Sequence, residues 1–145
     1  MTRINAGISV KYLTDEHLLA EHREIKRLSY CLDKAIKSGN INNIPDKFTL
    51  GKGHVLFFLD KMKYTLKRYV EIYDEAISRG FDVQCYKDNW KDVGNEYMNA
   101  YEAHDSDRNS VIKRITERIN NSRKKSWNYY GKIINKSEAI KLLYE

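Results

Sequence analysis

Cysteine, proline and long hydrophobic runs are scarce in this sequence of 145 residues. The two cysteines, Cys31 and Cys85, form no C-x-x-C motif, and the four histidines show no metal-ligand spacing, so neither a disulfide framework nor a zinc site is indicated. No apolar stretch approaches the roughly 20 residues needed to cross a bilayer, and the start lacks the apolar region of a secretory signal. We therefore expect a soluble intracellular protein that is not secreted.

Positive charge is in excess. Lysine and arginine together number 26 against 20 acidic residues, which gives a net charge of +6. Such an excess favours phosphate-bearing partners, because bound cations release the counterions of a nucleic acid. The length suits one domain, residues 1–145, that buries a core without disulfides or metals.

The spacing of apolar residues predicts three main helices. The first covers about 15–37, with Thr14 as N-cap and Gly39 beyond its end. The second covers about 54–78 and the third runs from 107 or 108 to about 121. The fold class we expect is all-α: a compact single domain of three main helices with long irregular connections.

The segments between these helices carry weaker signals. Residues 40–50 contain the only proline and several asparagines, which is typical of a loop. Residues 81–109 show no period, and a short helix near 94–103 is one alternative. A basic turn, SRKKS, and an aromatic stretch, WNYYGK, form a basic aromatic C-terminal segment.

Two groups of charged residues are open to two interpretations each. Arg23, Glu24 and Arg27 could form a solvated face with an ordinary i,i+3 ion pair, or a phosphate-binding pair beside a general acid or base. The lysines around 127–132 could be solvated about a tail that packs on the core. Cations interleaved with aromatic rings also suit nucleic acid, because cations hold phosphates and rings stack on bases.

Several blocks of the sequence resemble one known family. They are MTRIN at the start, HLLAEHRE with Arg27, LGKGHVLFFLDK, RGF at 79–81, RITERI at 114–119 and WNYYGK at 127–132. In order and spacing they resemble the phage endonuclease V family of pyrimidine-dimer DNA glycosylases with AP lyase activity. The resemblance fails at about 82–110 and after Lys132, and it implies a largely helical single domain.

The resemblance implies that the start of the chain supplies the catalytic nucleophile. In that family Met1 is removed and the α-amino group of the next residue, here Thr2, attacks the sugar C1′, forms a Schiff base and breaks the strand by β-elimination. An α-amine has a pKa of about 7.7–8.0, so an appreciable fraction of it is neutral and nucleophilic near pH 7. Glu24 matches the catalytic carboxylate. No metal and no organic cofactor is implied.

The resemblance also implies how DNA is held. Arg3, Arg23 and Arg27 match arginines around the lesion, and Arg114 and Arg118 match cations that contact the backbone. Members kink the DNA and expel the base opposite the lesion. The DNA-binding residues implied for the C-terminal segment are Lys125, Trp127, Tyr129 and Tyr130.

Departures from the family pattern leave alternatives open. An extra residue lies between Asn5 and Leu13, His22 replaces an aromatic residue, and WNYYGK is one residue short. The same mechanism could act on another damaged base or mainly on abasic sites, or the chain could be a non-catalytic basic DNA-binding module. We expect damaged double-stranded DNA as the partner, with no membrane and no protein partner, and a monomer in the cytoplasm of a bacterial or virus-infected cell.

Overall fold

The computed structural model describes residues 2–145, of which most lie in helices. The helices are α1 (Asp15–Ile25), α2 (Leu28–Ser38), α3 (His54–Phe58), α4 (Met62–Ser78), α5 (Asp105–Asn121) and α6 (Lys136–Leu142). Two strands, β1 (Ser126–Tyr129) and β2 (Lys132–Asn135), form a hairpin before α6. Short 3₁₀ turns cover Val10–Tyr12, Asn40–Asn43, Lys87–Trp90 and Asn95–Tyr97.

The first predicted helix is two helices, α1 and α2, that meet in a kink at Lys26 and Arg27. Both kink residues keep nearly helical dihedral angles, and neither is Gly or Pro, so the sequence carries no breaker there. The predicted ends are confirmed. Thr14 caps α1 through its side-chain oxygen, and Gly39 ends α2 at a positive φ of 82°.

The second predicted helix is also divided, into α3 and α4. The chain turns at Lys61, whose φ of −124° and ψ of 41° lie outside the helical region, and its ammonium donates to the carbonyl of Phe57 at 2.9 Å. The alternative helix near 94–103 is wrong, because that stretch holds only a 3₁₀ turn. The third predicted helix is α5, which begins at Asp105 behind a capping box of His104 and Asp107.

The all-α prediction is wrong in the C-terminal segment. Strands β1 and β2 pair antiparallel, with Trp127 opposite Ile134. Their two-residue turn has positive φ at both Tyr130 (52°) and Gly131 (78°), as a type I′ hairpin turn requires. A tyrosine seldom takes this conformation, so the sequence did not signal the hairpin.

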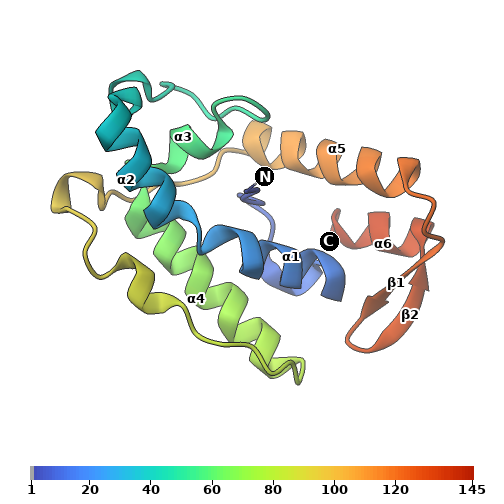
Figure 1. Cartoon of the computed structure of the whole chain (residues 1–145). Coiled ribbons are helices and arrows are strands. Elements are labelled where there is room, and N and C mark those ends of the chain that lie inside the picture. The colour runs from blue at the N-terminus through green and yellow to red at the C-terminus, as the bar shows by residue number, and fades with distance from the viewer. Residues whose placement is uncertain (1) are drawn as a thin grey trace.

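The helices pack on one another around a core that includes the beginning of the chain. Helix α1 packs against α4 and β1, and α5 packs against α6. Residues 4–6 are buried although they belong to no helix or strand. Figure 1 shows the start of the chain between α1 and α5.

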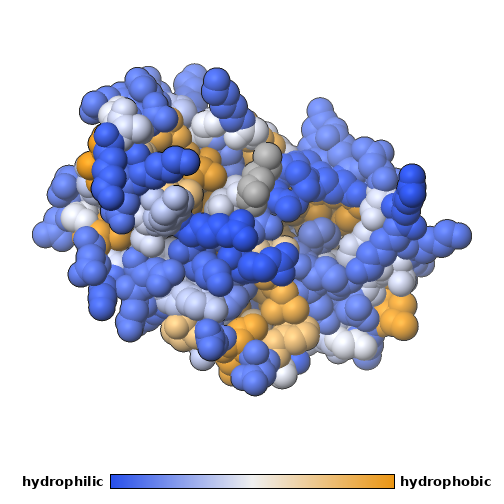
Figure 2. Space-filling view, viewed as in Figure 1, coloured by the Kyte–Doolittle hydropathy of each residue, from blue (hydrophilic) through white to orange (hydrophobic). Residues whose placement is uncertain are grey.

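One face of the molecule is mainly hydrophilic (Figure 2). On the face seen in Figure 2 hydrophilic residues predominate, and apolar residues form small separate groups. Within residues 2–145, no helix combines the length and apolar character needed to span a membrane.

Candidate active site

The start of the chain, residues 2–5, is held by buried side chains instead of a sheet. The backbone N–H groups of the third, fourth and fifth residues donate to Glu24, His54 and Glu21 in turn, at 3.0, 3.0 and 3.2 Å. Thr2, just before them, is only 6% exposed. Three consecutive main-chain contacts therefore fix the segment that carries the predicted nucleophile.

Glu24 is buried beside this segment. Its carboxylate, in a residue that is 6% exposed, accepts from the backbone N–H of Arg3 and from two guanidinium nitrogens of Arg3, both at 3.3 Å. The solvated-face interpretation is wrong for Glu24, whose ion pair is with Arg3 and not with Arg27. Arg23 and Arg27 lie exposed, and within residues 2–145 neither guanidinium makes a hydrogen bond or an ion pair.

A second buried carboxylate lies one helical turn earlier. Glu21 forms a two-pronged ion pair with Arg68 at 2.9 and 3.0 Å and also accepts from the side-chain amide of Asn5 at 2.9 Å. Burial by itself would lower the pKa of Arg68, but the Glu21 carboxylate raises it above its ordinary value. Sequence reasoning missed Glu21. The available signal was its i,i+3 spacing to Glu24, which places both acids on one face of α1.

Three arginines gather at a small cavity next to Glu24. Arg3, Arg114 and Arg118 line it, and Arg114 donates to the side-chain oxygen of Asn5 at 2.8 Å. Burial, together with the charges of Arg118 and Arg3, lowers the pKa of Arg114 to about 10, so it stays charged at neutral pH. Its Nε is buried and, among the described residues, has no hydrogen-bond partner. Crowded cations with an unused donor favour an anion at this place.

His17 lines the same cavity. Its Nδ1 lies 2.8 Å from the hydroxyl of Thr14, and burial is the main cause that lowers its pKa to about 4. The imidazole is therefore neutral near pH 7. The bond joins the ring to Thr14, the N-cap of α1.

The cavity has a volume of about 30 Å³, which suits a water molecule and not a nucleotide. Of the arginines that line it, Arg118 is exposed and the side chain of Arg3 is 31% exposed, so both can be reached from solvent. A larger cavity of about 1010 Å³ lies along α4 and residues 100–103. None of the predicted site residues lines it, and Arg68 in its wall is the partner of Glu21.

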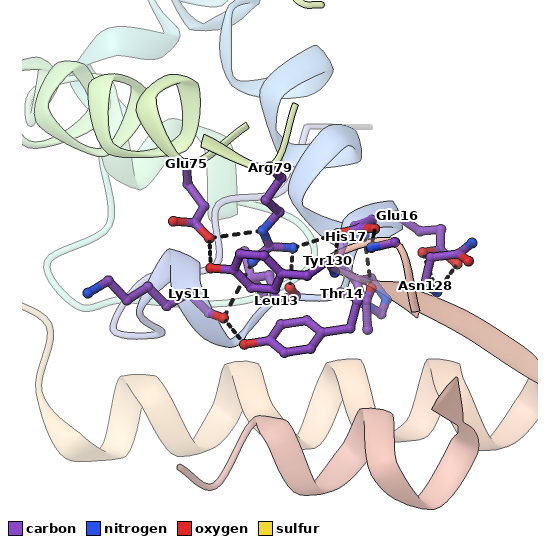
Figure 3. A network of polar contacts seen from close by, with 12 residues as sticks. Lys11, Leu13, Thr14, Glu16, His17, Glu75, Arg79, Asn128 and Tyr130 are labelled. Atoms are coloured by element: carbon purple, nitrogen blue, oxygen red, sulfur yellow. Dashed lines mark hydrogen bonds and ion pairs between the residues drawn. The ribbon is translucent and has the colours of Figure 1, made fainter. Parts of the chain in front are cut away.

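The C-terminal aromatic residues are occupied by contacts that fasten the hairpin to the body. Arg79 lies at the centre of these contacts (Figure 3), where it pairs with Asp15 and Glu75, each at 2.9 Å. The rings of Tyr129 and Tyr130 lie 5.2 and 4.3 Å from its guanidinium carbon. The interpretation of this segment as a tail packed on the core therefore holds for these two rings.

Hydrogen bonds from the hairpin complete the attachment. The amides of Tyr130 and Gly131 donate to Asp15 at 3.1 and 3.2 Å, and the hydroxyl of Tyr130 donates to Glu75. Trp127 is buried, Lys125 is exposed and Tyr130 remains 45% exposed. Contact of these residues with DNA stays a prediction.

Within residues 2–145, no group of three or more His, Cys, Asp or Glu side chains is arranged to hold a metal ion.

A family model described as pyrimidine dimer DNA glycosylase matches residues 1–89 of the chain. The match contains the buried chain start and its carboxylates, whereas α5 and the hairpin lie beyond it. Predicted site residues inside the match are Thr2, Arg3, Arg23, Glu24 and Arg27. Because the match extends over more than half of the sequence, the chain belongs to the pyrimidine dimer DNA glycosylase family.

Proposed function

We propose that this protein is a DNA glycosylase and AP lyase that acts at UV-induced cyclobutane pyrimidine dimers through the α-amine of Thr2. The observation that carries the proposal is the 3.0 Å hydrogen bond from the backbone N–H of Arg3 to Glu24. It brings a buried carboxylate within one residue, about 3.8 Å of backbone, of the proposed nucleophile. An amine beside a carboxylate is the pairing that imine chemistry at a sugar needs.

The proposed reaction proceeds in two stages. The neutral amine attacks C1′, the bond from C1′ to the base nitrogen breaks, and its electron pair leaves with the base, which takes up a proton. The nitrogen loses a proton, its lone pair forms a double bond to C1′ as the bond from C1′ to O4′ breaks, and O4′ takes up a proton, which opens the sugar ring and leaves a protonated imine. Removal of a proton from C2′ then expels the 3′ phosphate and nicks the strand. Glu24 stabilises the cationic sugar in the first stage and moves protons in the second.

The arginines supply binding. Arg3, Arg114 and Arg118 surround a cavity whose crowded cations favour an anion, and we assign the phosphates that flank the lesion to them. We assign further backbone or base contacts to two exposed arginines, Arg23 in α1 and Arg27 at the kink between α1 and α2. The remaining proposed contacts come from the hairpin and its approach: Lys125, Trp127, Tyr129 and Tyr130.

Reduction of the imine tests the nucleophile. Borohydride added during cleavage of a dimer-containing duplex should join protein to DNA, and peptide mapping should place the adduct on the α-nitrogen of Thr2. Met1, whose removal frees this amine, lies outside the described residues, so intact mass must first establish that it is absent. A preparation that retains Met1 is the matched control: it should bind the duplex and leave it intact. An adduct on an internal lysine would refute the assignment.

A second experiment tests which lesion the protein cleaves. Duplexes that carry a cyclobutane dimer, another damaged base or a preformed abasic site are compared under single-turnover conditions. We expect cleavage of the dimer and abasic duplexes. Cleavage of the abasic duplex alone would restrict the activity to lyase chemistry, and binding without any cleavage would leave a DNA-binding module.

A further inference from the structure

One contact of the chain start comes from outside α1. His54, the first residue of α3, accepts the backbone N–H of Ile4 at its Nε2, 3.0 Å away. Its other nitrogen, Nδ1, lies 2.9 Å from the carbonyl oxygen of Thr49. Because a carbonyl can only accept, Nδ1 must carry the ring proton, and Nε2 is left bare to accept from Ile4. The two bonds select one tautomer of a neutral imidazole.

We propose that His54 is a positioning residue, which sets the place of the Thr2 amine against Glu24 by fixing the backbone of Ile4 between α1 and α3. This inference rests on the proposed function of Thr2. His54 does not touch the reacting atoms; it acts on them through two residues of backbone.

The contacts from α1 alone do not fix the position of residues 2–5. Glu24 and Glu21 hold the amides on either side of Ile4, and both belong to α1. Among residues 2–145, His54 supplies the third side-chain contact to these consecutive amides, and it comes from a different element. With it absent, the segment can tilt away from α1. The anchor lies two residues from the amine, at most about 7 Å along extended backbone. A displacement of about 1 Å at a reacting atom can slow a reaction about a hundredfold.

The surroundings of the ring hold it rigidly. Phe48 and Phe58 meet it edge to face, with ring centroids 5.6 and 5.3 Å away. His54 is 3% exposed, so its rotamer is fixed by packing as well as by its two hydrogen bonds. A ring held in this way can hold the backbone of Ile4 in turn.

The charge state agrees with this role. Burial lowers the pKa of His54 most, the carbonyl of Thr49 opposes this, Arg114 on α5 lowers it further, and Glu21 on α1 raises it. The net direction is downward, so the imidazole is neutral near pH 7. A protonated ring would turn an N–H of its own toward the N–H of Ile4 and break the contact.

Two substitutions separate the two bonds of His54. The side-chain oxygen of glutamine in His54→Gln can reach the position of Nε2 and still accept from Ile4. The shorter amide in His54→Asn can replace only Nδ1, which keeps the bond to Thr49 and loses the one to Ile4. His22→Phe is the matched control, since His22 is also buried and bonded to a carbonyl, that of Gln84, but among residues 2–145 its ring makes no hydrogen bond to residues 2–5.

The measurement is the single-turnover rate of borohydride trapping at a preformed abasic site, with the affinity for the same duplex measured separately. We expect His54→Asn to slow trapping about a hundredfold while the dissociation constant changes less than about threefold. His54→Gln should recover at least about tenfold of that loss, and His22→Phe should stay near the wild-type rate. The double variant His54→Asn/Glu24→Gln supplies a test that a purely structural role would not pass. Its trapping should be slowed by much less than the product of the two single effects, because both substitutions disturb the same pairing of amine and carboxylate.

The outcomes distinguish the two proposals. If the wild type gives no adduct at Thr2, the proposed function fails. If the wild type is trapped at Thr2 and folded His54→Asn is trapped equally fast, or if its effect multiplies fully with that of Glu24→Gln, the positioning role of His54 alone is refuted. Should His54→Asn fail to fold, His54→Phe, which puts an aromatic ring without nitrogens in the same place, is used with the same expected loss.

Discussion

Glu24→Gln is the substitution that separates a catalytic carboxylate from a structural one. The glutamine oxygen can still accept the backbone N–H of Arg3, which is 3.0 Å from Glu24 in the native protein. What is lost is the negative charge opposite the guanidinium of Arg3, whose side chain is 31% exposed and so partly screened by solvent. Hydrogen bonds to a charged group contribute about 1.5–3 kcal/mol and neutral ones about 0.5–1.5 kcal/mol. We expect the variant to lose about 1–2 kcal/mol of stability and to fold.

The catalytic effect should be much larger than this. If Glu24 stabilises the developing sugar cation, loss of its charge should slow base release at a dimer about a hundredfold or more, which corresponds to about 2.7 kcal/mol of activation free energy. Cleavage at a preformed abasic site should fall less, because the base is already absent and Thr2 has only to form the imine.

The assay is single-turnover cleavage of a dimer duplex and an abasic duplex at saturating protein. Glu16→Gln is a suitable control, because it removes one negative charge from the same helix, α1, at a carboxylate that does not line the cavity and bonds Lys124 and the backbone N–H of Asn128. It should cleave both duplexes at nearly the wild-type rate. A folded Glu24→Gln protein that releases dimer bases as fast as the wild type would remove Glu24 from the mechanism.

Two further substitutions test the phosphate contacts and the hairpin. Arg118→Ala should weaken binding to damaged and undamaged duplexes alike and reduce the slope of log affinity against log salt by about 0.9, measured by titration at several salt concentrations. Lys113→Ala, at an exposed cation of α5 that does not line the cavity, should leave the slope unchanged, and equal slopes for all three proteins would exclude a phosphate contact at Arg118. Arg79→Met keeps the apolar stem but leaves Asp15 and Glu75 buried without their cation, so the free energy of unfolding should fall by about 3–5 kcal/mol and the melting temperature by on the order of 10 °C. Hydrogen exchange at the amides that donate to Asp15 should become faster, and a melting temperature within a degree of wild type would contradict the central role given to Arg79.

Local signals in the sequence were sufficient to predict where most of the helices lie. Thr14 and Gly39 mark helix ends because capping depends on neighbouring residues, and the apolar period located α4 and α5 because it reflects one buried face. The breaks at Arg27 and Lys61 were not predicted, because the apolar pattern continues across both and neither break contains Gly or Pro. The hairpin was missed because its turn depends on Asp15, more than a hundred residues away in sequence.

By itself the sequence determined the family and the residue types around the chain start: Thr2 and Arg3, a Glu on an amphipathic helix, and the arginines that we predict to contact DNA. Only the tertiary structure decided which of these groups meet. It turned Glu24 toward Arg3 instead of Arg27, placed Arg114 and Arg118 beside them from α5, and brought in His54 and Glu21 to hold the backbone. The physical reason is that residues 2–5 belong to no helix or sheet, so their buried N–H groups must find acceptors on side chains, and only packing determines which acceptors come within reach.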